Sequence, residues 1–569
     1  MTYCSAMAEV ASGGERVREG EAALARGAWA EARAIFEEEL EAGETLEALE
    51  GLSWAAWWIE DVPACLDARE RAYRLGRQTG DRRRAAMLAL WLGDDHLIFR
   101  GEKAVANGWF QRAARILDGL DPCPEHGWLA ALQGYMALGE GDTARARELA
   151  ARARELGRRL GVVCLEMFGL AVEGVALVNE GQVEAGMRCL DEATAAALGG
   201  EYEQIVPAGW TCCLLIGACE RVRDYDRAAQ WCRKVEEFSR RMRINFVTGT
   251  CRAHYGAVLT WHGNWPEAER QLTEATEDLT ANRPSWSGAA LVRLADLRRR
   301  QGRLAEAEEL LSQAQGNALA PLGMAELALD QGDALAARDL LEPLLRRLPA
   351  ENRTLRAHPL ELVVRAHLAA GAIESATPHV SELRAIAAAV GTQPLRAAVS
   401  LSEGLLAAAG GDHETARERL EDAVELFAAS GAPFEMGRAR LELAAVLVAR
   451  DREDAAAREA TVALRRFDEI GAAAESARAR ELLKRLGVAP QARRAPHRDA
   501  VLTPRQVEVL RLVSHGLTGN EIAVRLVLSK HTVHRHLQNA YARLGCCSRA
   551  SAVAKANRLQ LLQRRGRMA

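Results

Sequence analysis

The chain has 569 residues, of which 27% are charged and only 5% aromatic, and its formal net charge is −4. This length suffices for three or four ordinary domains or for one long repeat array. The longest apolar run, Leu443–Ala449, is too short to cross a bilayer, and the N-terminus lacks a charged segment followed by an apolar one. These features predict a cytoplasmic protein without a membrane segment.

A short pattern recurs through most of the chain: a glycine or aspartate at a turn, followed by small alanines in the next helix. Clear copies begin at Gly27, Gly263, Gly302, Gly332, Gly371 and Gly411, and weaker ones near Asp61, Gly141, Gly181, Asp224 and Asp451. From Asp224 onward the steps are 39, 39, 30, 39, 40 and 40 residues. A period in this range is typical of helix pairs stacked into a superhelix, and strand patterns are almost absent. The predicted fold class is therefore all-α, with a helical-repeat region over residues 15–486; a non-repeating helical bundle is the alternative.

Tryptophan is concentrated near the start of this repeat region. Five residues are candidates for a ligand or partner surface: Trp54, Trp57, Trp58, Trp109 and Trp128. Stacked on the concave wall of a superhelix, they could bind a small ligand or a peptide. The alternative is that they fill the core between repeats, which is the commoner use of such side chains.

No constellation of residues indicates catalysis, a metal or a cofactor. The phosphate-binding pattern Gly-x-x-x-x-Gly-Lys-Ser/Thr is absent, as are a nucleophile elbow and the His-Glu-x-x-His motif. The twelve cysteines include no Cys-x-x-Cys pair and no two-pair zinc spacing. Cysteine in such helices is usually a small buried hydrophobe, and a thiol switch in the 212–251 group or at Cys546 and Cys547 is the alternative. We therefore expect a protein that is not an enzyme.

Residues 487–500, rich in proline and arginine, are predicted to be a linker, after which the charge changes sign. Residues 501–569 contain twelve lysines and arginines but only two acids, a formal +10 on a chain whose total is −4. A basic module attached to an acidic body is typical of nucleic-acid binding.

Three short helices are predicted within residues 502–547, each with its own start signal. Thr503 precedes Pro504, Thr518 precedes Glu521 by three residues, and Ser529 precedes Lys530. Because only two residues separate the second helix from the cap of the third, the two helices should form a tight helix-turn-helix. This motif can place its second helix in a DNA major groove.

The last of these three helices has two different faces. Val533, Leu537, Ala540 and Leu544 form an apolar stripe that would pack against the first two helices. The opposite face presents the candidate base-reading residues His534, Arg535 and Gln538. The candidate contacts to the DNA backbone are Thr518, Lys530, His531, Thr532 and His536. A polar face is common to any surface helix, but the charge, spacing and capping together favour DNA binding.

This segment resembles the LuxR-type helix-turn-helix of bacterial transcription regulators. The residues that match its pattern are Leu502, Thr503, Arg505, Glu508, Val509, Leu510, Gly516, Thr518, Glu521, Ile522, Ala523, Ser529, Thr532, Val533, His536, Leu544 and Gly545. The resemblance implies a four-helix domain at 501–569, base reading by His534, Arg535 and Gln538, and a homodimer through a last helix at 548–562. His534 stands where the family often has lysine, so the base preference does not carry over. Cys546 and Cys547 replace the usual Val-Arg pair, so the geometry of that turn does not carry over either.

The repeat region is similar to tetratricopeptide repeats, with the longer period of the variant found in large LuxR-type regulators, although their ATPase module is missing. The chain as a whole is predicted to be a sequence-specific, DNA-binding transcriptional regulator of bacterial type. Its repeat region would sense a ligand or protein partner or mediate assembly, and RNA polymerase is a further candidate partner. The alternative is an interaction scaffold whose DNA-binding domain mainly localises it to promoters. A sigma-factor-like use is disfavoured because no aromatic, basic helical region precedes the motif.

Overall fold

In the computed structural model, the described residues form helices joined by turns, which confirms the all-α fold class. These residues are 2–562, except 203–204, 243–245, 315, 489–501, 503, 516, 527–529, 545, 547–548 and 560. The chain divides into two compact units, Met1–Pro490 and Gln491–Ala569. Within the described ranges, no helix combines the length and the apolar character that a membrane crossing needs. The predicted linker at 487–500 lies almost entirely outside the described residues and stays a prediction.

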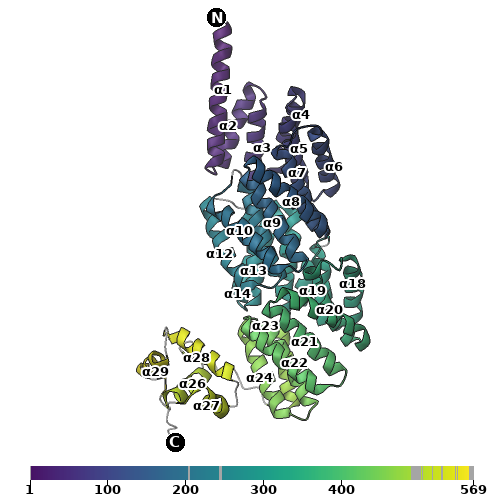
Figure 1. The fold of residues 1–569 in the computed structure, drawn as a ribbon, viewed down its shortest axis with the longest axis vertical. Coiled ribbons are helices and arrows are strands. Elements are labelled where there is room, and N and C mark those ends of the chain that lie inside the picture. The colour runs from purple at the N-terminus through teal and green to yellow at the C-terminus, as the bar shows by residue number, and fades with distance from the viewer. Residues whose placement is uncertain are drawn as a thin grey trace. The chain divides into compact units, whose positions relative to one another are not determined.

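The first unit consists of helices α1 to α25 (Figure 1). Its first half contains α1 Thr2–Ala25, α2 Trp29–Ala42, α3 Leu46–Trp58, α4 Val62–Thr79, α5 Arg82–Arg100, α6 Lys103–Leu117, α7 Pro124–Glu140, α8 Thr143–Leu160, α9 Val163–Asn179, α10 Val183–Gly199, α11 Ile205–Arg221 and α12 Tyr225–Met242. Its second half contains α13 Phe246–Trp261, α14 Trp265–Asn282, α15 Pro284–Arg300, α16 Leu304–Gln313, α17 Ala320–Asp330, α18 Ala334–Arg347, α19 Arg353–Ala369, α20 Ile373–Val390, α21 Gln393–Ala409, α22 His413–Ala429, α23 Pro433–Val448, α24 Glu453–Ile470 and α25 Ala473–Arg485. The helical region thus begins before residue 15.

The turns that the repeat pattern predicts adopt the left-handed backbone conformation. Gly27, Gly263 and Gly411 have φ angles of 72°, 77° and 81°. Because glycine has no Cβ, it adopts this conformation without a steric cost. The recurring glycine therefore marks the point where one helix ends and the next begins.

In two of the weaker copies of the repeat, the turn between helices is made by a residue other than glycine, followed by an aspartate. Glu60 and Arg223 carry the left-handed φ, at 64° and 58°, although neither is glycine. The aspartate that follows each of them caps the next helix: Asp61 accepts a hydrogen bond from the backbone N–H of Ala64, and Asp224 accepts one from that of Arg227. Asp61 and Asp224 are thus N-caps, whereas Asp451 itself carries the left-handed φ, at 57°.

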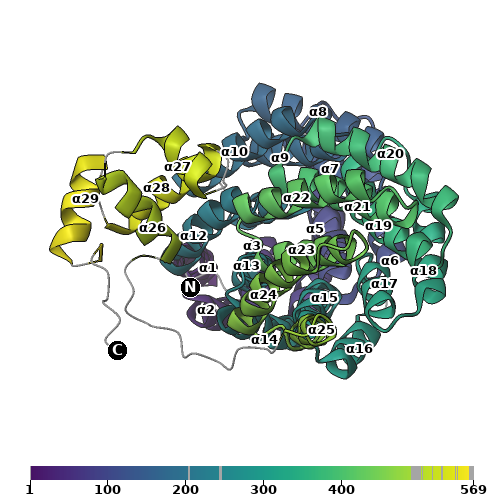
Figure 2. The same cartoon turned by 90° about the horizontal axis from the view of Figure 1, so that it is seen from below.

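The helices of this unit form two layers. Each helix packs on the next, and from α5 to α23 each odd-numbered helix also contacts the next odd-numbered one. Odd-numbered helices therefore form the inner layer. Figure 2 shows the unit along its length, with even-numbered helices such as α8, α18 and α20 on the outside. The helix pairs therefore stack into a coil with an inner and an outer layer.

Successive turns of the coil touch one another. Helix α15 contacts α5, α19 contacts α9, and α20 contacts α10, so contacting helices are ten apart and one turn takes five helix pairs. Polar contacts join the same turns. They are the ion pair of Glu60 with Arg283 at 3.1 Å, the hydrogen bond from Thr392 Oγ1 to the Val222 carbonyl at 2.8 Å, and that from Trp261 Nε1 to the Ser430 carbonyl at 3.1 Å. The coil is therefore stabilised between turns as well as along them.

Asn352 makes a further polar contact between turns of the coil, and its substitution tests whether such contacts stabilise the fold. Its side chain is fully buried, its Nδ2 donates to the Gly141 carbonyl at 2.6 Å, and its Oδ1 accepts from the Thr143 hydroxyl. We expect Asn352→Ala to lower the free energy of unfolding by about 1–3 kcal/mol, because both partners are left without a hydrogen bond. Urea titration measures this change. Gln331→Ala, at an exposed position, is the control and should leave stability unchanged; equal effects of the two substitutions would contradict the turn-to-turn role.

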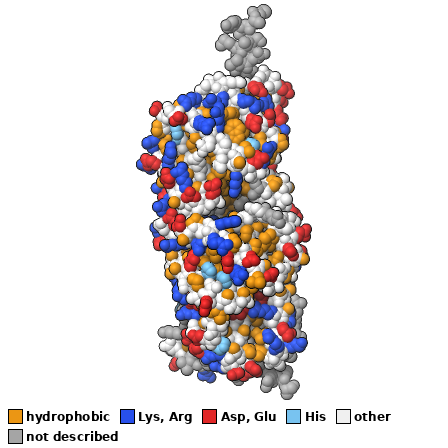
Figure 3. All heavy atoms as spheres, turned by 90° about the vertical axis from the view of Figure 1, so that its right-hand side faces the viewer, with side chains coloured by type: hydrophobic (Ala, Val, Ile, Leu, Met, Phe, Trp, Pro, Cys, Tyr) orange, Lys and Arg blue, Asp and Glu red, His pale blue; other side chains and the backbone are white. Residues whose placement is uncertain are grey.

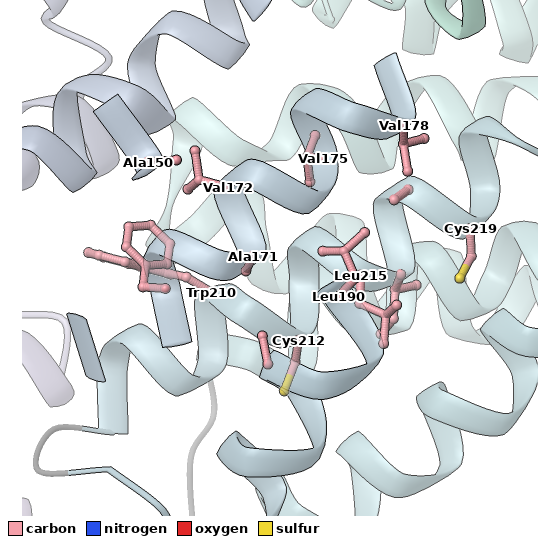
Figure 4. Close-up of a cluster of buried hydrophobic side chains, with 14 of the residues drawn as sticks. Ala150, Ala171, Val172, Val175, Val178, Leu190, Trp210, Cys212, Leu215 and Cys219 are labelled. Carbon is pink, nitrogen blue, oxygen red and sulfur yellow. The ribbon is translucent and has the colours of Figure 1, made fainter. Parts of the chain in front are cut away.

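The inner layer changes character along the chain, and its first half is aromatic. Trp91, Trp128, Phe168 and Trp210 come from α5, α7, α9 and α11. Their ring centroids are 6.2, 6.4 and 5.3 Å apart in that order, and Trp210 closes the set by lying 6.1 Å from Trp91. We call these four residues the aromatic quartet. Figure 4 shows the adjoining core, with Trp210 of α11 near Ala171 and Val172 of α9.

The second half of the inner layer carries charges. Glu220 of α11 lies 2.7 Å from Arg293 of α15 and 2.6 Å from Nδ1 of His254 on α13. Further along, Arg299 and Arg300 of α15 pair with acids of α15, α17 and α23. These acids are Asp296, Glu326, Asp330 and Glu435. The inner layer is therefore stabilised by contacts between aromatic side chains in its first half and by ion pairs in its second half.

The charged half makes the stability of this unit depend on pH. The pKa of His254 is below its usual 6.5, because burial and the neighbouring Arg293 disfavour the imidazolium despite Glu220. The folded chain thus keeps His254 neutral at a pH where the unfolded chain binds a proton. Stability should therefore fall as pH drops below about 6.5, by at most about 1.4 kcal/mol per pH unit for this histidine.

Thermal denaturation between pH 5 and 8 measures this dependence, with His254→Gln as the test variant. The variant should show a shallower loss of stability below pH 6.5 than the parent chain. His413→Gln, at a helix start remote from Glu220 in the sequence, serves as the control. Identical pH profiles for the parent and His254→Gln would show that His254 does not contribute.

The second unit is a small helical domain with its own core. It contains α26 Pro504–Ser514, α27 Gly519–Leu526, α28 Lys530–Leu544 and α29 Arg549–Arg558. Buried residues from α26, α28 and α29 form one cluster, and those from α26, α27 and α28 form another. The core lies where these helices meet, and α28 contributes to both clusters.

Candidate nucleic-acid interface

The apolar stripe of α28 packs as predicted. Val533 is fully buried with Val509 and Ile522, and Ala540 and Leu544 lie in a cluster with Leu510. Helix α28 contacts α26, α27 and α29. Its apolar stripe therefore faces the domain core, and His534 and Gln538 on its opposite side are exposed.

The start of α27 is fixed by reciprocal hydrogen bonds. The Thr518 backbone N–H and hydroxyl donate to Glu521 Oε2 at 2.7 and 2.8 Å, and the Glu521 N–H donates back to Thr518 Oγ1 at 3.4 Å. The bonds from Thr518 hold the pKa of Glu521 below its usual range. This capping box confirms the start that the sequence predicts. Thr503 and Ser529, the other two predicted caps, lie outside the described residues.

The candidate base-reading residues lie on the outward part of α28. His534 and Gln538 are exposed, and Gln538 Nε2 lies 3.4 Å from His534 Nε2, one helical turn away. Arg535 lies on the same helix, but its side chain is outside the described part of the domain. An exposed imidazole and an amide side by side can donate and accept hydrogen bonds at a base edge. The roles of these three residues stay predictions.

The candidate backbone contacts are less fully described. Thr518 is exposed at the start of α27, although its hydroxyl already bonds Glu521, and His536 is half-buried in α28. Lys530, His531 and Thr532 form the first turn of α28, and their side chains are outside the description. Residues near the start of a recognition helix are the ones that approach the groove and its phosphates.

The last helix is shorter than the predicted 548–562. Helix α29 ends at Arg558, and the chain then turns so that Leu562 is buried against the core. The Leu561 N–H donates to the Ala556 carbonyl at 2.9 Å, and Arg511 Nε donates to the Leu562 carbonyl at 3.2 Å. The pattern of apolar residues continues through this turn, which is why the sequence extends the helix too far. Leu559, at the end of the helix, is 46% exposed.

The five candidate tryptophans do not form one surface. Trp57 and Trp128 are buried, with 2% and 3% of their surface exposed, so they serve mainly as core. Trp54 and Trp58 are partly buried and pack against them. Trp109 contacts Tyr73 and lines an open recess with Val105, Gly108 and Arg112. A role of the five residues in ligand binding stays a prediction.

The sequence reasoning missed Trp91 and Trp210, although a signal was present. The residues Trp54, Trp91, Trp128, Phe168 and Trp210 follow one another at steps of 37, 37, 40 and 42 residues, close to the repeat period. The reasoning also missed the buried ion pair between Arg69 and Asp95, at 2.6 Å. No local pattern reveals that pair, because its residues lie on different helices.

The cysteines of α11 to α13 lie close together, but their environment disfavours reactivity. Cys213 Sγ lies 4.0 Å from Cys251 Sγ. Burial raises the pKa of Cys232 to about 12, and burial also raises the pKa of Cys212 and Cys219. A raised pKa keeps a thiol protonated, whereas the thiolate is the reactive form. Among the described residues, no three His, Cys, Asp or Glu side chains are placed to hold a metal ion.

The two units differ in their charge. The face drawn in Figure 3 carries basic and acidic side chains interspersed. Many exposed charges of the helical region form ion pairs along one helix, such as Arg33 with Glu37 and Arg417 with Glu421. The domain at 501–569 instead has a formal charge of +10. Attraction to a polyanion is therefore expected of the small domain rather than of that face.

Comparison with known proteins identifies the small domain. Residues 500–556 match the family model of the bacterial regulatory proteins, luxR family. An HTH-type transcriptional regulator of Mycobacterium bovis is 49% identical over 57 residues, which are 10% of this chain and 6% of that protein. The quorum sensing-dependent transcriptional regulator VjbR of Brucella ovis is 44% identical over 63 residues, which are 11% of this chain and 24% of that protein. The matched segment is thus a small part of each relative.

Two solved structures align with most of this chain. The Cut9–Hcn1 hetero-tetramer of APC/C has a TM-score of 0.43 at 15% identity, covering 82% of this chain and 95% of that one. The human IFIT1 dimer with PPP-AAAA has a TM-score of 0.39 at 15% identity, covering 71% of this chain and 91% of that one.

Proposed function

We propose that the LuxR-family helix-turn-helix domain at residues 500–556 makes this chain a sequence-specific, DNA-binding transcriptional regulator. The observation that carries the proposal is the match of this domain to that family. Two features of the chain support it. The apolar stripe of α28 is buried and its His534–Gln538 face is exposed, and the domain is strongly basic on an acidic chain. Relatives that share this segment are named as transcriptional regulators.

The proposed mechanism divides the contacts between bases and phosphates. Helix α28 enters the major groove, where His534, Arg535 and Gln538 read base edges. The residues that contact phosphates are Thr518, Lys530, His531, Thr532 and His536. Phosphate contacts supply affinity and fix the position of the helix, whereas base contacts supply the choice of sequence.

A second copy of the chain completes the proposed DNA complex. Two domains joined through the last helix would place their recognition helices about one turn of DNA apart. The exposed Leu559 at the end of α29, with Lys555 and Arg558 exposed beside it, supports an interface there. A binding site built from two half-sites is expected if the domain acts as a dimer.

The repeat region is proposed to sense a ligand or partner and to control the DNA-binding domain. The second candidate function is a scaffold in which the helical region recruits other proteins, RNA polymerase among them, and the DNA-binding domain localises it. Stacked helix pairs of this kind form extended surfaces on which ligands and other proteins bind, which supports a binding role of either kind.

Selection of bound duplexes from random DNA tests the proposal directly. The full chain and residues 487–569 should both enrich one sequence, and that sequence should contain two related half-sites. Recovery of random sequences by both proteins would contradict sequence-specific binding. Removal of residues 1–486 then separates the two roles of the repeat region. Uncontrolled transcription by the remaining domain indicates a sensor, and DNA binding without activation indicates a recruiting scaffold.

A further inference from the structure

Two even-numbered helices of the repeat region, α4 and α6, enclose an open recess. It is lined by Tyr73 of α4 and by Val105, Gly108, Trp109 and Arg112 of α6, and its volume is about 540 Å³. A recess of this size can take a large side chain of another molecule. Because it is open to solvent, an occupant can enter without a rearrangement of the fold.

Two contacts between α4 and α6 fix the walls of the recess. The rings of Tyr73 and Trp109 meet edge to face, with centroids 5.1 Å apart and an angle of 83° between the planes. Arg112 Nε donates to the Tyr73 hydroxyl at 2.9 Å. Both rings also pack against the buried core, so they are held in place before any ligand binds. A preformed site of this kind loses little conformational entropy when it is occupied.

The apolar part of the recess is accessible to solvent. Val105 is 41% exposed, and Trp109, one helical turn further, is half-buried. Gly108 leaves open space beside them, since a Cβ added there would meet no atom within 4 Å. Tyrosine, tryptophan and arginine are the residues that most often dominate the energy of protein–protein binding, and all three line this recess.

The charges along α6 are all positive. The helix contains Lys103, Arg112 and Arg115 but no acidic residue. Arg112 and Arg115 are exposed, and their spacing from Val105 and Gly108 places all four on one face of the helix. Within the described residues, neither arginine forms an ion pair. Their guanidinium groups can therefore bind carboxylates of another molecule.

Helix α4 adds to this positive charge. Arg77 lies one helical turn beyond Tyr73, is exposed, and forms no ion pair with any described residue. The acid nearest to Tyr73 on this helix is Glu70, which pairs with Arg74 at 3.6 Å. The recess thus combines an accessible apolar surface with a basic rim, and its charge is complementary to an acidic partner.

The basic segments of the chain itself are unsuitable occupants. Residues 487–500 contain three arginines and a single acid, Asp499, and residues 501–569 have a formal charge of +10. Like charges disfavour binding of either segment at the basic rim. The charge of the recess therefore favours an occupant from another protein.

We propose that the recess between α4 and α6 binds a short acidic segment of a partner protein. One aliphatic or aromatic side chain of that segment enters beside Trp109, and its carboxylates pair with Arg112 and Arg115. The inference rests on the proposed role of the repeat region in binding a partner. Insertion of the apolar side chain removes Val105 and Trp109 from water, and the arginines give the contact direction and specificity. Because even-numbered helices form the outer layer, the partner reaches the recess without entering the coil.

The substitution Gly108→Leu blocks the recess and is the central test variant. The added side chain enters open space, and leucine favours a helix more than glycine does, so the melting temperature should not fall. Gly139→Leu is the matched control, because Gly139 is an exposed residue of α7 at which a Cβ also meets no atom within 4 Å.

Selection from a phage library of random dodecapeptides on the full chain identifies the occupant. The library is first depleted on the Gly108→Leu chain, which carries the same basic DNA-binding domain and removes peptides that bind there. Peptides then enriched on the parent chain should contain several acidic residues and at least one large apolar residue. No enrichment after depletion, or enrichment of peptides without acidic residues, would overturn the proposal.

Anisotropy of a fluorescein-labelled copy of an enriched peptide measures its affinity. Gly108→Leu and Arg112→Glu should each weaken binding about tenfold or more, because they remove the apolar and the charged contact respectively. Gly139→Leu, and Arg152→Glu at an exposed position of α8, should bind as the parent chain does. Unchanged binding by both recess variants would refute the assignment.

Two measurements distinguish this occupant from others. If Gly108→Leu dissociates a dimer of the full chain in sedimentation, the occupant is a second copy, and the proposal of an acidic partner is overturned. If the parent chain binds phosphatidylserine vesicles and Gly108→Leu does not, the occupant is a lipid surface, which overturns it as well.

DNA binding, measured separately, distinguishes this inference from the proposed function. Sequence-specific DNA binding by a chain that selects no acidic peptide overturns the recess proposal alone. Binding of an acidic peptide at the recess by a chain that selects no DNA sequence overturns the regulator function and leaves the site in place.

Discussion

Replacement of Arg69 by methionine should lower the free energy of unfolding of the repeat region by about 3–5 kcal/mol. Both Arg69 and Asp95 are essentially inaccessible to solvent, with 1% and 0% of their side chains exposed. Methionine keeps much of the arginine's volume but leaves the Asp95 carboxylate buried without its partner. Burial already raises the pKa of Asp95 despite Arg69, so loss of the arginine should make the charged form more costly still.

Urea titration monitored by tryptophan fluorescence suits this measurement, because seven of the twelve tryptophans precede residue 130. The double substitution Arg69→Met with Asp95→Asn should recover much of the loss, since both charges of the pair are then removed together. Arg16→Met is the matched control, because Arg16 and Glu38 form an ion pair with both side chains largely exposed. The control should change stability by less than about 1 kcal/mol. A similarly small effect of Arg69→Met would show that the buried pair is not important for stability.

The double substitution Arg535→Ala and Gln538→Ala should abolish most of the preference for the selected DNA sequence. Each residue that reads a base edge with two hydrogen bonds contributes about 1–3 kcal/mol to discrimination. Loss of both should therefore bring the affinity for the selected sequence close to that for random DNA. Affinity for random DNA should decrease much less, because phosphate contacts dominate it and most of them remain.

Fluorescence anisotropy with a selected and a scrambled duplex at one salt concentration measures both affinities. Arg525→Ala removes one exposed positive charge of α27 and is the control. It should weaken binding to the two duplexes by similar factors, without changing their ratio. If the double variant also kept that ratio, Arg535 and Gln538 would not be the residues that read the sequence.

The parts of the fold that depend on neighbouring residues could be predicted from the sequence. The capping box of Thr518 and Glu521 and the apolar stripe that buries Val533 both involve residues within a few positions of each other. The repeat period similarly reflects one helix pair at a time. Such local signals establish where helices begin, which face is buried and that the pairs stack.

Contacts between turns of the coil could not be predicted in this way. Glu60 pairs with Arg283, which is 223 positions away, and the pairing depends on the number of helix pairs per turn. That number is set by the small rotation between successive pairs, and no single repeat specifies it. The candidate tryptophans show the same limit. Trp128 is buried against Trp91 and Phe168 of the neighbouring repeats. Trp57 also lies under the guanidinium of Arg283, from the next turn of the coil.

The contacts between helices ten positions apart also restrict how such a chain can change its length. In an open array, each repeat touches only its neighbours, so one helix pair can be gained or lost with a local effect. Here, an extra pair between α5 and α15 would place a different helix opposite α5, and Glu60 would no longer face Arg283. Duplication or deletion of a single repeat would therefore disrupt every contact that spans it. The number of repeats in this region is consequently constrained by its geometry, and viable length variants should differ at the ends of the coil rather than in its middle.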